Sequence, residues 1–177
     1  MTVSIVMRLK RILQHSWLSE TATQRALPPD LVERLRQRVA ASEQRHTGEI
    51  RIYVETSLPL SYLWRDASTP ELTRQRALSE FGKLRVWDTA NNNGVLIYLL
   101  LAEHAIEVVA DRGLNTLMAP QDWQAMVLRM REAFQHNQYE EGLTQALAEI
   151  STLLVQHFPL REGETNPNEL PDAPIVN

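Results

Sequence analysis

Three separated points of the chain carry side chains whose oxygen atoms can bind a hard cation. The first is Glu49, at the start of the alternating segment "EIRIYVETS". The second is the loop "DTANNNG", which begins at Asp88 and contains three successive amides. The third is "ADRG", with Asp111 and Arg112. Carboxylate and amide oxygens are the ligands that Ca²⁺ and Mg²⁺ prefer, so these residues are candidates for a divalent-cation site.

The strands that carry these residues decide whether they meet. Residues 50–55 alternate between apolar and polar, which predicts a strand with one buried face. Residues 95–101 form a continuous apolar run, as expected of a central strand covered on both sides, and residues 106–110 predict a third strand. A helical crossover makes the first two strands parallel, and the short "AEHA" connection makes the last two a hairpin. All three polar points then lie at one edge of the sheet.

We call the residues expected at this edge the rim. They are Glu49, Asp88, Asn91, Asn92, Asn93, Asp111 and Arg112. Within the rim, Asp88, Asn92 and Asp111 are the candidate metal ligands, although their spacing matches no EF-hand loop. A second interpretation stays open, because asparagine tolerates left-handed backbone geometry and caps its own turn. On that interpretation "NNNG" is a tight turn without a ligand.

Helices are expected on both faces of the sheet. The segment after "LPPD" predicts a helix that begins near Asp30 and that Gly48 can stop. The segment "STPEL" predicts another, with Thr69 as its N-cap. Apolar stripes over 120–134 and 143–158 predict two closing helices. The economical arrangement is a three-layer α/β/α sandwich, with a mixed sheet of three or four strands between helices.

The two ends of the chain are expected to differ from this core. Residues 1–27 comprise an amphipathic helix over Ser4 to Leu18 and a linker, residues 28–159 the core domain, and residues 160–177 a flexible, acidic, proline-rich tail. The apolar stripe of the first helix favours docking on its own domain. The alternative, which we do not favour, is a surface-seeking helix that touches anionic lipid or a partner protein.

Composition excludes several classes of protein. A net charge of −4 argues against a nucleic-acid partner. The absence of cysteine excludes disulfides, thiolate metal sites and thiol catalysis. The chain has no apolar run of the roughly 20 residues that a membrane span needs. Its first basic residues follow the short apolar stretch instead of preceding it, unlike a signal peptide. We therefore expect a cytoplasmic protein.

Several motifs together carry a family resemblance. They are "TGEIRIYVE", "NNNGVLIYLLLAEHAIEVVADRG", Trp123 and "YEEGLTQALAEISTLLVQHFP". From Gly48 to Pro159 this pattern resembles the TPM domain family, known from thylakoid-lumen proteins of photosystem II repair and from many bacterial proteins. The resemblance implies about four strands, and we place the fourth near Tyr62. It also implies divalent-cation binding in some members and the acid phosphatase activity ascribed to plant members. The tail "NELPDAP" looks like a small bacterial branch without a membrane anchor.

Two functions of different class are consistent with these observations. We prefer a non-catalytic binding or adaptor domain in quality control or envelope-linked assembly, with another protein as its partner and Ca²⁺ or Mg²⁺ at the rim. The alternative is a metal-assisted acid phosphatase, in which Arg112 and the cation hold the phosphoryl oxygens. Against hydrolysis, Ser57 and Ser61 fall at the edge opposite Asp111, and His104 falls in the hairpin turn away from the rim.

Overall fold

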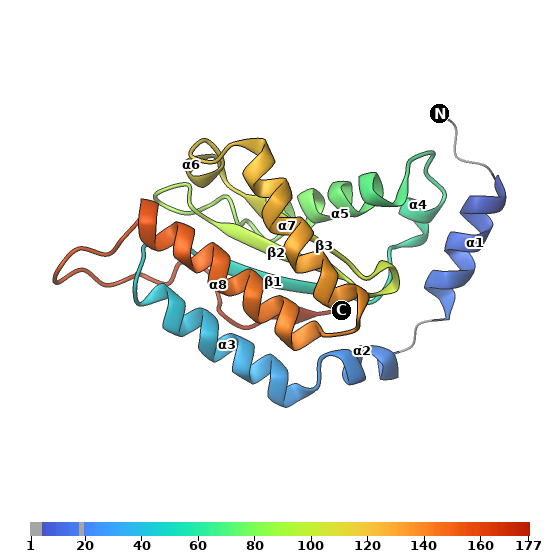
Figure 1. Ribbon diagram of the computed structural model, residues 1–177, viewed down its shortest axis with the longest axis horizontal. Helices are drawn as coiled ribbons and strands as arrows, with labels where there is room; N and C mark the ends of the chain where they lie inside the picture. The colour runs from blue at the N-terminus through green and yellow to red at the C-terminus, as the bar shows by residue number, and fades with distance from the viewer. Residues whose placement is uncertain (1–4, 18–19) are drawn as a thin grey trace.

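The computed structural model describes residues 5–17 and 20–177, and its helices cover both faces of one sheet (Figure 1). The predicted three-layer α/β/α sandwich with an extra N-terminal helix is confirmed. In chain order the elements are α1 (Ile5–Ser16), α2 (Glu20–Ala26), α3 (Pro29–Glu43), β1 (Ile50–Glu55), α4 (Leu60–Leu63), α5 (Thr69–Lys83), β2 (Val95–Leu100), η1 (Leu101–Glu103), β3 (Ala105–Ala110), α6 (Arg112–Asn115), α7 (Pro120–Gln135), α8 (Tyr139–His157) and β4 (Ile175–Val176).

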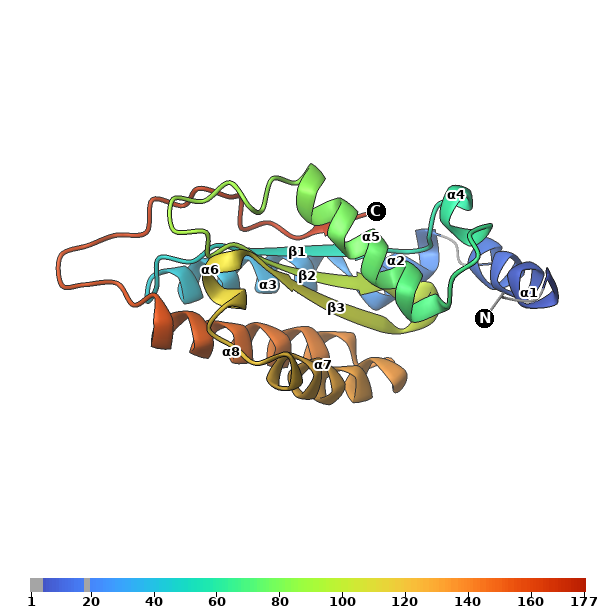
Figure 2. The same cartoon turned by 90° about the horizontal axis from the view of Figure 1, so that it is seen from above.

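The strand order in the sheet is β3-β2-β1-β4. β1 runs parallel to β2, with Ile50 opposite Val95, and β3 runs antiparallel to β2, with Ala110 opposite Val95. The parallel pair and the hairpin are therefore as predicted. Helices α3, α7 and α8 pack their apolar side chains on one face, while α5 covers the other, as Figure 2 shows from above.

The fourth strand is not where we predicted it. Tyr62 lies in the short helix α4, and the strand beside β1 is β4, from the end of the chain. The free edge of β1 explains this pairing, because its backbone groups need partners. Asn177 N donates to Val54 O at 2.9 Å, and Thr56 N donates to Asn177 O at 2.8 Å. The segment 160–177, predicted to be a flexible tail, is extended but also buries Leu170 against the sheet.

Both faces of β1 are buried, so the prediction of a strand with one buried face is wrong. The alternating polar positions Arg51, Tyr53 and Glu55 are covered by α5 and the tail. Buried polar groups need partners, and these have them. The Arg51 guanidinium donates to the carbonyl oxygen of Pro171. Alternation alone reports side-chain polarity and cannot show that a distant segment will cover the polar face.

Glu55 is the centre of a buried ionic network on that face. Arg76 donates from Nε to Glu55 Oε2 at 2.8 Å and from Nη2 to Oε1 at 2.5 Å. The Tyr98 hydroxyl donates to Glu55 Oε2 at 2.6 Å, and Arg76 also pairs with Glu80 at 2.8 Å. Burial raises the pKa of Tyr98, so the phenol stays protonated as a donor. The network satisfies two carboxylates that would otherwise be costly to bury.

Two predicted helix boundaries are wrong for local reasons. The N-cap of α5 is Ser68 and not Thr69, because Ser68 and Glu71 form a reciprocal capping box. Helix α3 ends at Glu43, well before Gly48. Gly48 instead lies at the entry to β1, where a Cβ atom would stand 2.5 Å from Leu154 Cδ2. The Leu154 side chain of helix α8 therefore packs close to the backbone at this position.

Helix α1 docks against α4 mainly through its polar side. Ile12 alone of the predicted apolar stripe packs partly against the core, so the predicted docking by the whole stripe is wrong. Arg11 and His15 are buried, whereas Leu9 and Leu13 are exposed. Ser4 and Leu18, the predicted ends of this helix, lie outside the described residues. Residues 20–26, predicted to be linker, form α2. In the part of the chain that the structure describes, no helix is long and apolar enough to cross a membrane.

Candidate functional site

The three polar segments of the rim meet at one end of the sheet, as the topology predicts (Figures 1 and 2). Backbone hydrogen bonds join them. Val95 N donates to Glu49 O at 2.8 Å, which ties the loop 88–94 to the entry of β1. Asp111 N donates to Gly94 O at 2.9 Å, which ties the same loop to the end of β3. The loop between them is therefore held from both sides.

Asn92 shapes this loop and holds the guanidinium group of Arg112 in place. Its φ of 52° lies in the left-handed region, as the turn interpretation requires. Its side-chain Oδ1 accepts a 3.0 Å hydrogen bond from Arg112 Nε, and its backbone oxygen accepts one of 2.8 Å from Gly113 N. The amide oxygen of Asn92 is thus already engaged by a guanidinium.

Asn93 faces the interior instead of solvent and is fully buried. Its Nδ2 donates to Thr47 Oγ1 at 3.1 Å, and Asn91 Nδ2 lies 3.5 Å from the same hydroxyl. Asn93 Oδ1 is buried and has no hydrogen-bond partner among the described residues. Sequence reasoning missed Thr47, although it stands directly before Gly48 in the "TGE" motif. A hydroxyl at a strand entry is a weak signal, and only the fold places it beside the asparagines.

Asp111 is the N-cap of α6 and keeps one carboxylate oxygen uncommitted. Oδ1 accepts a 2.7 Å hydrogen bond from Arg112 N, while Oδ2 is buried and without a partner in the described structure. The carbonyl oxygens of Asn91 and Asn92 crowd the same corner. A Cβ atom at Gly113 would lie 2.7 Å and 2.4 Å from them, respectively. The corner between the loop and α6 is therefore rich in oxygen atoms.

Glu49 and Asp88 do not join this corner. Glu49 turns to the tail, where Leu170 N donates to its Oε2 at 3.1 Å, and burial raises the pKa of its carboxyl group. Asp88 pairs with Arg85 at 2.5 Å. Within residues 5–17 and 20–177, no group of three or more His, Cys, Asp or Glu side chains is placed to hold a metal ion. Of the predicted ligands, Asp111 has a buried carboxylate oxygen without a hydrogen-bond partner among the described residues, and Oε1 of the rim residue Glu49 is in the same situation.

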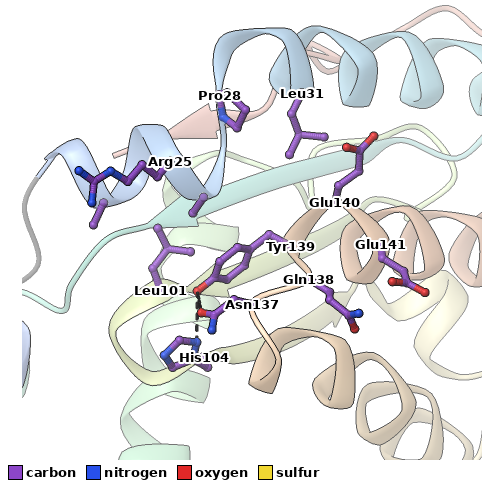
Figure 3. Close-up of a pocket in the computed structure, with 12 residues that line it drawn as sticks. Arg25, Pro28, Leu31, Leu101, His104, Asn137, Gln138, Tyr139, Glu140 and Glu141 are labelled. Atoms are coloured by element: carbon purple, nitrogen blue, oxygen red, sulfur yellow. Dashed lines mark hydrogen bonds between the residues drawn. The ribbon is translucent and has the colours of Figure 1, made fainter.

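A cleft of about 710 Å³ lies at the opposite end of the sheet (Figure 3). It opens between the turn from α2 to α3, the hairpin after β2 and the connection from α7 to α8. Sequence reasoning missed it because no single segment supplies its walls. Its lining residues are Ala22, Arg25, Ala26, Pro28, Leu31, Leu101, His104, Asn137, Gln138, Tyr139, Glu140 and Glu141.

The polar centre of the cleft is the pair Tyr139 and His104. The Tyr139 hydroxyl donates to Asn137 Oδ1 at 3.0 Å and lies 3.2 Å from His104 Nδ1. Burial raises the pKa of Tyr139, so its phenol stays protonated. Figure 3 shows the carboxylates of Glu140 and Glu141 pointing away from this pair. The cleft therefore offers a ligand a concave space and hydrogen bonds. Neither glutamate is placed to act as a base beside Tyr139 and His104.

Comparison with known proteins identifies the family. The family model described as the TPM domain matches residues 21–153. The chain belongs to the TPM domain family. The resemblance indicated by the motifs is thereby confirmed, and the match covers β1, β2, β3, the rim and the residues that line the cleft. A search of curated proteins finds no match for this TPM domain.

Two solved structures share the fold. The NMR structure of BA42 protein from the psychrophilic bacterium Bizionia argentinensis superimposes with a TM-score of 0.71 at 20% identity, covering 85% of this chain and 95% of that one. The N-terminal domain of a protein from P. gingivalis superimposes with a TM-score of 0.57 at 21% identity, covering 76% of this chain and 82% of that one. At such low identity these likenesses establish the α/β fold and leave the activity open.

Proposed function

We propose that this TPM domain is a non-catalytic binding module whose rim takes a divalent cation. A surplus of acceptor oxygens supports the proposal. Asp111 Oδ2 and Asn93 Oδ1 are both buried, and neither has a hydrogen-bond donor among the described residues. A buried polar group left without a partner costs about 1–3 kcal/mol. A hard cation bound to these oxygens would offset that cost, because a cation can take the place of the missing hydrogen-bond donor.

Asp111 is the residue that would supply negative charge to the ion. The backbone oxygens of Asn91 and Asn92, which lie at the same corner, add neutral ligands of the kind that Ca²⁺ and Mg²⁺ accept. One carboxylate among neutral ligands predicts a weak site, with a dissociation constant of roughly 10⁻⁴–10⁻³ M. When bound, the ion would add positive charge between the loop and α6 and so link β2 to β3 at this end.

Metal-assisted hydrolysis has less support. A phosphatase needs a nucleophile or an activated water beside positive charge for the phosphoryl oxygens. Ser57 and Ser61 follow β1, at the end of the sheet opposite the rim, and the Arg112 Nε is engaged by Asn92. One carboxylate at the corner between the loop and α6 suits cation binding better than it suits a metal-centred reaction, in which the metal ligands and the base must be separate groups.

Thermal unfolding with EDTA, Ca²⁺ or Mg²⁺ tests the proposal. A cation at about 100 times its dissociation constant adds about 2.7 kcal/mol to the free energy of unfolding. For a chain of this size that raises the melting temperature by roughly 5–10 °C. Asp111→Asn should abolish the increase while keeping the N-cap, because asparagine caps as well as aspartate. Asp88→Asn is the matched control and should keep the increase.

Three outcomes would contradict the proposal. If neither ion raised the melting temperature, the asparagines would serve only to form the turn. Loss of the increase in Asp88→Asn as well would place the ion elsewhere at the rim. Hydrolysis of p-nitrophenyl phosphate that needs the cation and disappears in Asp111→Asn would establish the phosphatase instead.

A further inference from the structure

Arg11 fixes helix α1 to the domain by capping backbone carbonyls. Its Nη2 donates to Leu63 O at 2.6 Å and to Arg65 O at 3.1 Å, and its Nη1 donates to Ala67 O at 3.0 Å. These carbonyls belong to the end of α4 and the turn after it. Carbonyls at a helix end lack partners within the helix, so a buried guanidinium with several donors satisfies them together.

His15 and Gln14 fix α1 to the hairpin. Leu58 N can only donate, so the His15 Nδ1 that lies 3.0 Å away must accept, and the ring proton is then on Nε2. That nitrogen donates to Glu103 Oε1 at 2.9 Å. Gln14 Nε2 donates to Ala102 O at 2.6 Å. Helix α1 is thus held to the domain by polar contacts along one side.

The other side of α1 is apolar and faces solvent. Ile5, Leu9 and Leu13 follow one another at four-residue spacing, which places them in one stripe, and Trp17 comes directly after the helix ends at Ser16. Their exposed fractions are 70%, 49%, 61% and 85%, respectively. Single exposed apolar residues are normal, but a contiguous stripe marks an interaction surface. We call these four residues the outer stripe.

The charge of this end of the chain differs in sign from the charge of the rest. Residues 1–19 contain Arg8, Lys10 and Arg11 and no acidic residue. The remaining residues, with 15 basic and 22 acidic side chains, have a net charge of −7. Lys10 is exposed beside the outer stripe. Arg11 is buried and Arg8 pairs with Asp66, so Lys10 is the basic side chain of α1 that can meet a charged surface. An apolar stripe beside such a cation complements an anionic lipid surface, in which the headgroups carry negative charge above an apolar layer.

We propose that α1 anchors the domain to the surface of an anionic lipid bilayer. The outer stripe would lie at the boundary of headgroups and acyl chains, with Trp17 at the interface that tryptophan prefers. Helix α1 lies at one end of the long axis of the molecule, beside α4 and away from the sheet (Figures 1 and 2). At this end of the molecule the outer stripe can lie on a flat surface without disturbing the contacts of Arg11 with the turn after α4 or of His15 with the hairpin.

A second copy of the chain is the alternative occupant, and charge argues against it. Two α1 helices paired in parallel through the outer stripe would bring Lys10 of each near its equivalent on the other. Like charges across such a contact are unfavourable, whereas anionic headgroups attract Lys10. The bilayer is therefore the occupant that satisfies both the apolar and the charged side chains.

Co-sedimentation of the full chain with lipid vesicles tests the proposal. Vesicles of phosphatidylcholine alone and of phosphatidylcholine with phosphatidylglycerol are compared in EDTA, which separates this test from cation binding at the rim. We expect binding to the anionic vesicles only. Leu13→Gln should weaken it roughly tenfold or more, the loss expected for one buried leucine side chain. Lys10→Gln should weaken it roughly fivefold.

The matched control is Leu128→Gln on α7, because Leu128 is 67% exposed and lies outside α1. It should bind as the wild type does, and both leucine variants should keep the wild-type melting temperature. Failure to bind anionic vesicles overturns the proposal. Equal binding to neutral vesicles, or an equal loss in Leu128→Gln, also overturns it. A dimer in sedimentation velocity that Leu13→Gln dissolves, without vesicle binding, would assign the stripe to a second copy.

Discussion

The backbone amide of Gly113 donates a 2.8 Å hydrogen bond to the carbonyl oxygen of Asn92, and a Cβ atom at Gly113 would lie 2.4 Å from that same oxygen. The contact joins the exit of β3 to the loop before β2. Both partners are backbone, so neither can move aside as a flexible side chain would. The rim is therefore closed at a point that tolerates only glycine.

Gly113→Ala should destabilise the domain by about 1–3 kcal/mol, because the added methyl group forces the loop away from α6. Urea unfolding measures the change. Gly82→Ala is the control, since Gly82 lies within α5 and a Cβ there would meet nothing within 4 Å. That variant should gain roughly 0.5–1 kcal/mol from helix propensity. Wild-type stability in Gly113→Ala would contradict the close contact.

Arg76→Met should cost about 3–5 kcal/mol, because it leaves the buried Glu55 without a cation and leaves Glu80 with Lys83 alone. Arg36→Met provides the comparison, since Arg36 pairs with Glu33 on the surface of α3 and such pairs contribute about 0–1 kcal/mol. The free energy of unfolding from urea titration distinguishes the two. Similar small losses in both variants would mean that the network on β1 is not buried in solution.

Glu43 gives the domain a pH dependence opposite to that of ordinary carboxylates. Burial raises its pKa to about 8 from the ordinary value of 4.5, although Ile50 N donates to its Oε1 at 2.9 Å. Between these two values the folded chain holds a proton that the unfolded chain has lost. The contribution of Glu43 to stability therefore falls as pH rises through that window. Glu43→Gln should remove the fall.

Between about pH 6.5 and 8 the effect of Glu43 on stability can be measured apart from that of His46. Burial lowers the pKa of His46 to about 4 from 6.5, so His46 adds stability as pH rises through that lower range and opposes Glu43 there. Above pH 6.5 we expect Glu43→Gln to gain on the wild type by on the order of 1–2 kcal/mol. Glu33→Gln on the same helix should show no such gain, since the pKa of Glu33 is about 2. Parallel pH profiles for Glu43→Gln and wild type would contradict the assignment.

Leu170→Ala tests whether the C-terminal segment is part of the fold. Leu170 is 8% exposed and packs in the core on the α5 side of the sheet, so truncation should cost about 2–3 kcal/mol. Val176, in β4, is 38% exposed, and Val176→Ala should cost less than about 1 kcal/mol. Guanidinium unfolding compares them. A neutral Leu170→Ala would support the flexible tail that composition predicts.

Local periodicity was sufficient for the elements that pack by their own apolar residues. The apolar run over residues 95–101 predicts a central strand, and the crossover and hairpin then place Asn92 and Asp111 at the same edge of the sheet. The same reasoning could not tell which way each rim side chain points. Glu49 turns to Leu170 and Asp88 turns to Arg85, because each finds a hydrogen-bond donor there.

The sequence by itself determined the layers, the strand directions and the position of the rim, since these depend on patterns within single segments. Only the tertiary structure decided the fourth strand, the buried polar face of β1 and the outward apolar side of α1. Each of these depends on partners far apart in the chain, as when Arg11 reaches Leu63 across 52 positions or Leu170 reaches Glu49 across 121. A local pattern records the polarity of a side chain, and the fold decides what covers it.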